Sequence, residues 1–509
     1  MNGREKSDPA IVAVKRANGA GRPAEEPVER RAGTEGNAGQ QSTPRAQGRA
    51  NVSQALDRVR QAARQRKEAR FISLLHHVDV ARLREAYFAL KRDAAAGVDG
   101  VTWRDYGADH ELRLADLCDR VHRGAYRAQP ARRVMIPKPD GRQRPLAIAA
   151  LEDKIVQKAV LGVLNAIYEE DFLGFSYGFR PGRSQHDALD ALVVGIDRRK
   201  VNFILDADIR SFFDTVSHEW LVRFLEHRIG DKRIVRLIQK WLKAGVLEDG
   251  IVSGAELGTG QGAVISPLLA NVYLHYAFDL WAEQWRRREA NGDMIIVRYA
   301  DDLVLGFEHE ADARRFQEAM RERLGAFELQ LHPDKTRLIE FGRHAAQNRD
   351  RGGLGKPETF DFLGFTFICG KSRRGGFLVK RKSRRTRVKA RLQAIKDQLR
   401  GRMHHPIAEQ GRWLNQVVAG FFAYHAVPTN GRTLMAFRRQ VAILWLRTLR
   451  RRSARDRTTW RRIEKIADQW LPKPRILHPW PNQRFDVKHP RWEPYAGKPH
   501  VRFCAGGAG

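Results

Sequence analysis

The sequence predicts an α+β protein, in which short strands and helices build one part of the chain and helices dominate a later part. The clearest β signal is a hairpin at 131–148, where two arms flank a Pro-Asp-Gly turn. Apolar runs at 203–205 and 294–297 have the length of short buried strands, and helical segments lie between them. Residues 413–450 are apolar with a helical period, which predicts a helical region after the strands.

The length and the charge of the chain limit what it can be. A chain of 509 residues has room for roughly two to four domains. Lysine and arginine number 92 against 59 aspartate and glutamate residues, which gives a formal net charge of +33. Such an excess favours a polyanionic partner, with a solvated basic surface as the alternative. We therefore expect a protein that acts on nucleic acid.

Cysteine usage and hydropathy exclude several classes of protein. The three cysteines (Cys118, Cys369 and Cys504) lie far apart and form no Cys-x-x-Cys pair, which argues against a disulfide framework or a cysteine zinc site. No apolar run approaches the ~18 residues that a membrane span needs. The N-terminus lacks the apolar core of a secretory signal. We expect an intracellular protein with no membrane partner.

The N-terminal residues 1–65 contain no aromatic side chain. A segment rich in Gly, Ala, Arg, Glu and Gln buries too little apolar surface to offset its ordering entropy, so it is predicted to be a disordered basic arm. A helix over 52–70, with Ser53 as a cap, is expected at its end. The elements predicted next are a helix with an apolar stripe at 83–90, a turn-rich break at 94–101, the hairpin, and helices at 151–169, 217–245 and 267–290.

The C-terminal part of the chain begins with a predicted loop between domains and then becomes strongly basic. A Gly-rich, charged stretch at 348–358 predicts a loop, and a strand-like patch follows at 359–368. Residues 371–402 carry fourteen lysines and arginines and a single acid. Arginines are dense again at 447–475. Such stretches suit contact with a phosphate backbone.

Carboxylates cluster at two places in this basic chain. Asp206, Asp208 and Asp214 follow the apolar run at 203–205, and a Tyr-Ala-Asp-Asp sequence at 299–302 separates two apolar runs. The second pattern predicts a hairpin whose tip carries two carboxylates. Because crowded acids repel unless a cation neutralises them, the clusters predict a Mg²⁺ site, the alternative being a turn with solvated aspartates. Two ions ~3.5–4 Å apart would hold the attacking and the leaving oxygen of a phosphoryl transfer.

The Tyr-Ala-Asp-Asp sequence resembles the catalytic signature of reverse transcriptases, and other segments match that family in the same order. Together they resemble a group II intron-encoded reverse transcriptase/maturase of the bacterial type without a C-terminal endonuclease domain. The matching segments are 97–103, 136–141 with 144–146, 177–184, 258–262, 265–271, 299–302, 331–336 and 362–365. One departure is Gly260, where the family often has proline; the glycine loosens the loop but removes no chemical group.

The resemblance implies a right-hand polymerase fold and a nucleotidyltransferase activity. The enzyme would be an RNA-directed DNA polymerase that also binds its parent group II intron RNA to assist splicing and retrohoming. Its partners would be intron RNA, an RNA template, a DNA primer, target DNA and dNTPs, in the bacterial cytoplasm at the nucleoid. The implied boundaries are 66–345 for the fingers and palm, 346–380 for the end of the palm and a linker, 381–455 for a helical thumb/maturase domain, and 456–509 for a basic DNA-binding-like region.

The resemblance also assigns roles to individual residues. The catalytic metal ligands would be Asp208, Asp301 and Asp302, which would hold two Mg²⁺ ions with Mn²⁺ as a substitute. Asp206 would help from the same strand, and Asp214 is expected to be a structural acid. The nucleotide-binding residues would be Lys138, Arg144, Phe213, Gln261, Gly262 and Lys335. The primer or template contacts would be Tyr299, Phe362, Leu363 and Gly364.

Several of these residues have a structural alternative. Lys138 and Arg144 would grip the triphosphate or else be surface cations on a hairpin. Phe213 would exclude a 2′-hydroxyl or simply fill the core. Lys335 would either protonate or only neutralise pyrophosphate, and the segment 362–365 would grip the primer or be plain β-core.

Two rival functions remain open at this stage. One is an RNA-binding maturase without polymerase activity, against which the three intact aspartates argue. The other is a domesticated or defence reverse transcriptase that has left its intron. The maturase-like region 381–455 favours the intron-bound function over this second rival.

Overall fold

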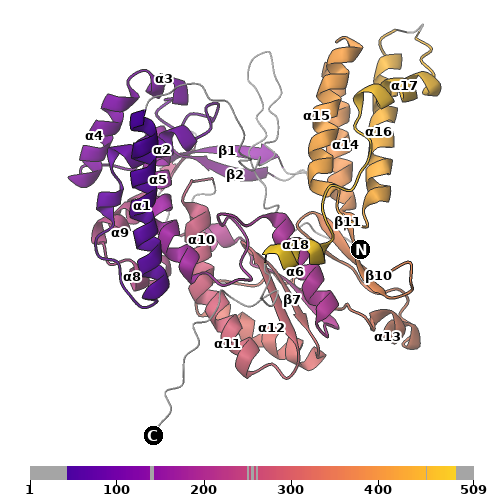
Figure 1. The fold of residues 1–509 in the computed structure, drawn as a ribbon, viewed down its shortest axis with the longest axis horizontal. Helices are drawn as coiled ribbons and strands as arrows, with labels where there is room; N and C mark the ends of the chain where they lie inside the picture. Colours follow the sequence, from indigo (N-terminus) through magenta and orange to yellow (C-terminus); the bar gives the residue numbers. More distant parts are fainter. Residues whose placement is uncertain are drawn as a thin grey trace.

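A computed structural model describes residues 43–137, 143–248, 251–253, 257–259, 262–453 and 456–488. Helices and sheets are mixed along the chain, which confirms the predicted α+β class. Figure 1 shows helices of the N-terminal part on the left, a central sheet with its helices below, and C-terminal helices on the right. No helix within these ranges is long and apolar enough to cross a membrane.

The N-terminal region is a helical group built around α5 (Leu151–Asp171). Helix α1 (Thr43–Gln65) packs along α5 through Leu56, Val59 and Ala63, which recur at helical spacing and are buried. The helix expected over 52–70 is therefore present but begins at Thr43 and ends at Gln65, and the predicted disorder is wrong for 43–65 because this apolar face offsets the ordering entropy. Residues 1–42 of that arm lie outside the described residues.

Short helices complete this group, and two of the stretches predicted to be helical lie within them. The apolar stripe at 83–90 lies in α2, and the predicted stretch 217–245 forms two helices, α8 and α9. The elements are η1 (Leu75–His77), α2 (Val80–Ala89), α3 (Trp103–Gly107), α4 (His110–His122), α8 (His218–Arg228) and α9 (Lys232–Lys243).

The predicted hairpin is confirmed. Strands β1 (Ala131–Pro137) and β2 (Gln143–Ile148) pair antiparallel, with Ile136 opposite Arg144. The sheet continues from β1 through β4 (Val246–Glu248) to β5 (Ile251–Ser253), in the order β2-β1-β4-β5. In Figure 1 this hairpin extends from the N-terminal helices toward the C-terminal ones.

A four-stranded antiparallel sheet forms the centre of the molecule, in the order β6-β7-β3-β8. Every residue of the largely apolar strands β6 and β7 is buried, as are five of the six residues of β3, so the predicted strands at 203–205 and 294–297 are confirmed. The strands are β3 (Phe203–Asp208), β6 (Met294–Tyr299), β7 (Asp302–Phe307) and β8 (Arg337–Glu340).

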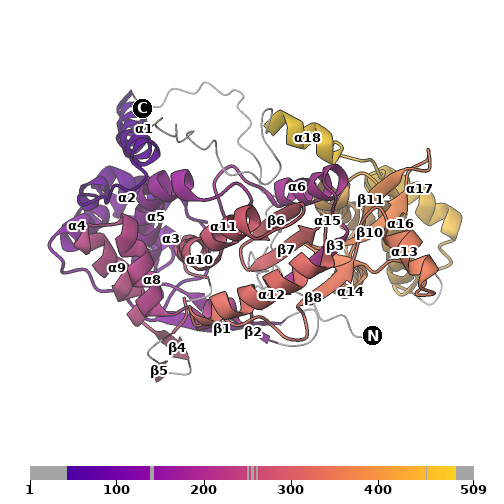
Figure 2. The ribbon, with the colours of Figure 1, turned by 90° about the horizontal axis from the view of Figure 1, so that it is seen from below.

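Helices pack closely on this sheet (Figure 2). Helix α6 (Gln185–Arg198) begins at a capping box of Ser184 and Asp187 and packs along β6, while α12 (Glu310–Gly325) contacts β3 and β7. The predicted helix at 267–290 is one run of three parts: α10 (Ser266–Leu274), a π-helical turn (His275–Asp279) and α11 (Leu280–Arg288).

The C-terminal part has a core of its own. Four helices surround the fully buried Trp445, whose Nε1–H donates to Gln410 Oε1 over 2.7 Å. The predicted helical stretch 413–450 is confirmed as two helices, and the core extends beyond the expected boundary at 455 into the next helix. The four are α14 (Arg385–Gly401), α15 (Ile407–His425), α16 (Gly431–Arg450) and α17 (Trp460–Trp470).

A three-stranded sheet connects the two cores. The predicted strand patch at 359–368 is split by a tight turn into β9 (Phe360–Phe362) and β10 (Phe365–Lys371), and β11 (Phe377–Ser383) follows. The phenylalanines of β9 and β10 belong to the first core. The loop expected at 348–358 begins instead with a short helix, α13 (Ala345–Arg351).

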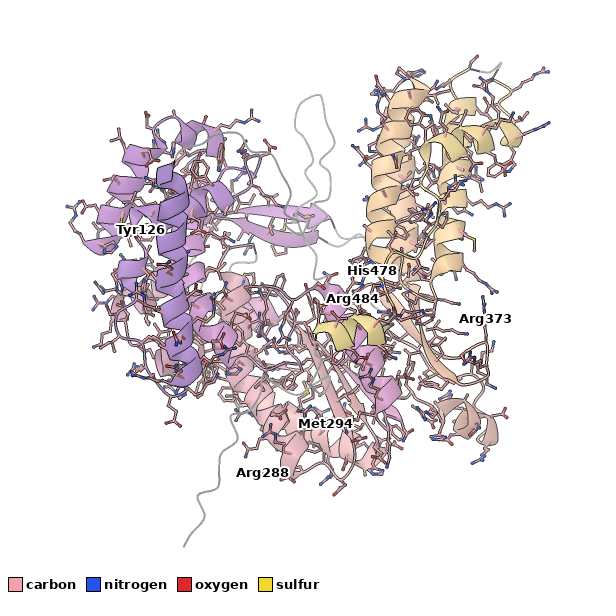
Figure 3. All side chains as sticks on the ribbon, viewed as in Figure 1. Tyr126, Arg288, Met294, Arg373, His478 and Arg484 are labelled. Carbon is pink, nitrogen blue, oxygen red and sulfur yellow. The ribbon has the colours of Figure 1, made fainter. Side chains whose placement is uncertain are left out.

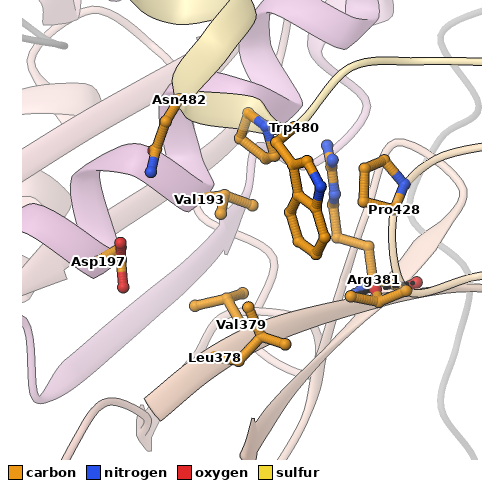
Figure 4. A pocket seen from close by; sticks show the side chains of 10 residues that line it. Val193, Asp197, Leu378, Val379, Arg381, Pro428, Trp480 and Asn482 are labelled. Atoms are coloured by element: carbon orange, nitrogen blue, oxygen red, sulfur yellow. Dashed lines mark hydrogen bonds between the residues drawn. The ribbon is translucent and has the colours of Figure 1, made fainter. Parts of the chain in front are cut away.

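The chain then returns to the central region through α18 (Pro481–Lys488), which lies beside α6 (Figures 1 and 2). Asp190 of α6 accepts from Arg381 Nη1 of β11 over 2.7 Å and lies 3.3 Å from Arg484 Nη1. Figure 3 shows Arg484 and His478 at the base of the C-terminal helices. A cavity of about 130 Å³ adjoins this junction, with Trp480 beside Arg381 (Figure 4).

We expect Asp190→Ala to destabilise the fold by about 3–5 kcal/mol, because it leaves two guanidinium groups without their buried carboxylate. The matched control is Asp486→Ala, which removes the exposed pair of Asp486 with Arg198 and should cost about 1 kcal/mol or less. Chemical denaturation of both variants measures the difference. Equal losses would mean that the buried cluster adds nothing to the junction.

The buried His425 makes the stability of the fold depend on pH. Burial lowers the pKa of His425 to about 3, so this histidine is neutral in the folded chain. The stability that this neutral histidine contributes is fully present above pH 6.5, the ordinary pKa of histidine, and is lost progressively below it. The loss amounts to about 2 kcal/mol of unfolding free energy at pH 5. We expect His425→Gln to reduce the fall in unfolding free energy between pH 7 and pH 5. An unchanged fall would contradict the buried neutral state.

Candidate active site

Strand register brings two of the predicted metal ligands face to face. Asp208 is the last residue of β3 and Asp302 the first of β7, and their Cα atoms are direct partners in the antiparallel ladder. Because side chains alternate along a strand, both carboxylates lie on the same face of the sheet, together with Asp206. Asp208 and Asp302 are only 2% and 3% exposed.

The predicted acidic tip is the turn between β6 and β7. Tyr299 pairs with Asp302, so Ala300 and Asp301 form a two-residue connection, which is here named the acidic turn. Ala300 has a φ of 56°, a left-handed conformation that costs a residue with a Cβ about 1–2 kcal/mol. The surrounding structure must therefore stabilise this turn.

A glycine lets a second loop close over the acidic turn. A Cβ on Gly178 would lie 2.3 Å from the backbone nitrogen of Ala300. Any larger residue at position 178 would therefore force one of the two segments to move. The backbone of Arg298 also donates to Phe175 O over 2.9 Å and accepts from Tyr177 N over 2.8 Å. The loop thus covers the free edge of β6.

A lysine neutralises one of the facing carboxylates. Lys335 Nζ lies 2.7 Å from Asp208 Oδ2, and the N–H of His332 donates to the carbonyl of Asp208 over 2.8 Å. On the same face, Arg337 Nη2 is 4.0 Å from Asp206 Oδ2. Lys335, two residues before β8, and Arg337, its first residue, therefore supply positive charge to the acid-bearing face of β3.

The residues of this face fit a hard divalent cation. Carboxylate oxygens are the ligands that Mg²⁺ prefers. Asp208 Oδ1 is buried and has no hydrogen-bond partner among the described residues, so it is available to a ligand. Within those residues, no three His, Cys, Asp or Glu side chains are grouped as a ready metal site. Phosphate oxygens of a substrate would have to complete the coordination.

The predicted nucleotide-binding residues are only partly described. Lys138 and Gln261 lie outside the described residues, and Arg144 is described only as a backbone position in β2. Phe213 lies in α7 (Phe212–Thr215), the short helix after β3, half-buried with its ring 5.5 Å from that of Phe212.

Gly262 lies in the loop before helix α10, and its backbone is close to strand β2. Helix α10 begins only at Ser266, so Gly262 does not open it. Gly262 has a φ of 111°, and a Cβ there would lie 2.8 Å from the carbonyl oxygen of Ala147. Its close approach is therefore to strand β2.

The four predicted primer contacts are all buried. Tyr299 lies opposite Asp302, with its ring 6.0 Å from that of Phe179. Phe362 and Leu363 are buried, and the turn at Leu363 and Gly364 packs on the C-terminal helices, where Tyr424 donates to Leu363 O over 2.7 Å. The structure thus places the side chain of Phe362 in the β-core, as in the structural alternative.

Sequence reasoning missed an arginine behind the acidic turn. Arg298 of β6 is fully buried and pairs with Asp279 of the π-helical turn. Burial raises the pKa of Asp279, and the guanidinium of Arg298 opposes that shift. The available signal was a charged residue inside an otherwise apolar strand, Met294–Tyr299.

Comparison with known proteins identifies the family. Residues 136–367 match the family model described as reverse transcriptase (RNA-dependent DNA polymerase). The chain is 35% identical over 298 residues to Protein YkfC of Escherichia coli (strain K12), covering 50% of this chain and 77% of that relative.

Two intron-associated proteins are also similar, although this chain spans only a quarter to a third of their length. An uncharacterized 91 kDa protein in the cob intron of Schizosaccharomyces pombe is 42% identical over 214 residues, 42% of this chain and 26% of that protein. The group II intron-encoded protein LtrA of Lactococcus lactis subsp. cremoris is 36% identical over 191 residues, 37% of this chain and 32% of LtrA. With the facing aspartates and the acidic turn in place, the chain belongs to the reverse transcriptases (RNA-directed DNA polymerases) of the group II intron-encoded reverse transcriptase/maturase family.

Proposed function

We propose that this chain copies RNA into DNA at the face formed by Asp208, Asp301 and Asp302. The observation that carries the proposal is the register of β3 and β7, which sets two carboxylates directly opposite each other. In this proposal the central sheet is the palm, the β1–β2 hairpin and N-terminal helices are the fingers, and α14 to α17 are the thumb/maturase domain.

The three aspartates would hold two Mg²⁺ ions. When bound there, the ions would lower the pKa of a primer 3′-hydroxyl and stabilise the negative charge of the pyrophosphate leaving group. The chain's own residues orient the reactants. The sheet fixes the carboxylates, and Lys335 offsets the charge of Asp208 over 2.7 Å. Phe213 follows β3 at a distance of five residues and would lie under the sugar of the incoming dNTP, where it would exclude a 2′-hydroxyl.

The C-terminal helices supply a surface for the nucleic-acid duplex and for intron RNA. Arg385, Lys389, Lys396 and Arg400 of α14 are exposed, while the apolar side of the helix enters the second core. Many such cations give strong binding that weakens as salt rises. We propose that this surface also binds the parent intron RNA to assist splicing, and that the region after 456 contacts target DNA at the nucleoid.

The first test separates the two activities. We expect Asp301→Ala with Asp302→Ala to abolish primer extension on an RNA template, because two carboxylates of the metal site are lost, while assistance to intron splicing persists. The control is Glu318→Ala with Glu322→Ala, which removes the same charge from exposed positions of α12. Loss of splicing assistance in a folded aspartate variant would refute the separation.

The second test concerns Lys335. If its ammonium neutralises Asp208, Lys335→Met should slow DNA synthesis by about 10- to 100-fold, and Lys335→Arg should restore most of the rate. Arginine keeps the charge but cannot give up a proton in the working pH range. An arginine variant as slow as the methionine variant would instead show that Lys335 transfers a proton. Single-turnover incorporation of one dNTP measures both.

A further inference from the structure

An arginine is buried where the strand pattern calls for an apolar residue. Arg298 and its partner Asp279 are both 0% exposed. Nε donates to Asp279 Oδ1 over 2.7 Å and Nη2 to Asp279 Oδ2 over 2.5 Å, a bidentate pair. A buried ion pair is weak support for stability, because apolar residues of the same volume often serve as well. The pair therefore calls for another explanation.

The remaining donors of the guanidinium reach the acidic turn and its neighbours. Nη1 donates to the carbonyl of Ala300 over 3.0 Å and to Asn271 Oδ1 over 2.9 Å, and Nη2 donates to Ser176 Oγ over 2.8 Å. All five N–H groups of Arg298 thus have acceptors, which fixes its plane and its position. Asp279 anchors this fork from the π-helical turn.

The held carbonyl belongs to the strained residue of the turn. Ala300 has the left-handed φ of 56°, and Gly178 closes on its backbone nitrogen. Asn271, which accepts from Arg298, also donates through Nδ2 to the carbonyl of Gly178 over 2.7 Å. One guanidinium therefore connects the acidic turn with the loop that covers it.

Arg298 does not belong to the reacting face. It pairs with Leu303 on β7, whereas the adjacent residue Tyr299 pairs with Asp302, so the side chain of Arg298 lies on the opposite face from the aspartates. It acts on them only through the backbone of the acidic turn.

We propose that Arg298 is a positioning residue that holds the acidic turn in its left-handed conformation and thereby presets Asp301 and Asp302. The inference rests on the proposed function of these aspartates. Because the Asp279 pair anchors the guanidinium, the turn is fixed before any substrate binds. Partners of this kind behind a metal ligand typically change affinity or activity by about 10- to 100-fold when they are removed.

The test compares two buried arginines. Arg298→Lys keeps the positive charge but loses the planar guanidinium and its bidentate pair with Asp279. Its matched control is Arg228→Lys. Arg228 is also buried and pairs with Asp171, with Nε 2.8 Å from Oδ2, and it also donates to backbone carbonyls within 63–69, away from the acidic turn. For each full-length variant, the measurements are Tm, kcat and the dNTP KM for primer extension on RNA, and binding of Mn²⁺ by electron paramagnetic resonance.

We expect Arg298→Lys to lower kcat by about 10- to 100-fold with a nearly unchanged dNTP KM, and to weaken Mn²⁺ binding by a similar factor. Arg228→Lys should lose comparable Tm yet keep kcat and Mn²⁺ affinity. Equal effects of the two variants, or parental kcat and Mn²⁺ affinity in Arg298→Lys, would overturn the inference. Should Arg298→Lys fail to fold, Ser176→Ala removes one acceptor of Nη2 while the arginine stays, and the same two readouts decide.

The parent enzyme separates this inference from the proposed function. If the parent chain does not extend a primer, the proposed function fails, and the inference that depends on it fails as well. If the parent extends the primer and Arg298→Lys matches it in kcat and Mn²⁺ affinity, only the positioning role is refuted.

Discussion

Two aspartates that face each other across paired strands impose the main constraint on this molecule. Asp208 and Asp302 are buried, and like charges in such a place repel strongly unless positive charge compensates them. Lys335 supplies part of that charge directly. We propose that divalent cations supply the rest at the adjoining ends of β3 and β7. The apolar strands and the helices packed on them hold the two side chains close despite the repulsion.

Opposite charges are concentrated in different parts of the chain. Arginines and lysines are exposed on the C-terminal helices, where they suit phosphate backbones, while the acids lie on the central sheet. The two parts have separate cores, and a buried cluster around Asp190 connects them through Arg381 and Arg484. The hydrogen bonds between this carboxylate and its two guanidinium groups form only in particular orientations. They therefore favour one arrangement of the two parts relative to each other.

Local patterns predicted much of the fold, and long-range contacts account for what was missed. The hairpin at 131–148 and the acidic tip each depend on a local pattern of apolar strand residues and turn residues only a few positions apart. The sequence alone therefore predicted both. The partners of Arg298 lie 19, 27 and 122 positions away, and no local pattern identifies them. The helix expected over 52–70 begins earlier, at Thr43, and no apolar pattern in the polar segment before 52 indicated that start. The close approach of Gly262 to Ala147 of β2 was also not foreseen, because the two residues are distant in sequence.

Primer extension by the parent chain tests the central claim most directly. The full-length protein is given an RNA template, an annealed DNA primer, dNTPs and Mg²⁺, with a parallel reaction in Ca²⁺. The account predicts extension that requires the RNA template and Mg²⁺ and stops in Ca²⁺. A folded protein that binds the primer–template but does not extend it in Mg²⁺ or Mn²⁺ would contradict the account and would leave RNA binding as its function.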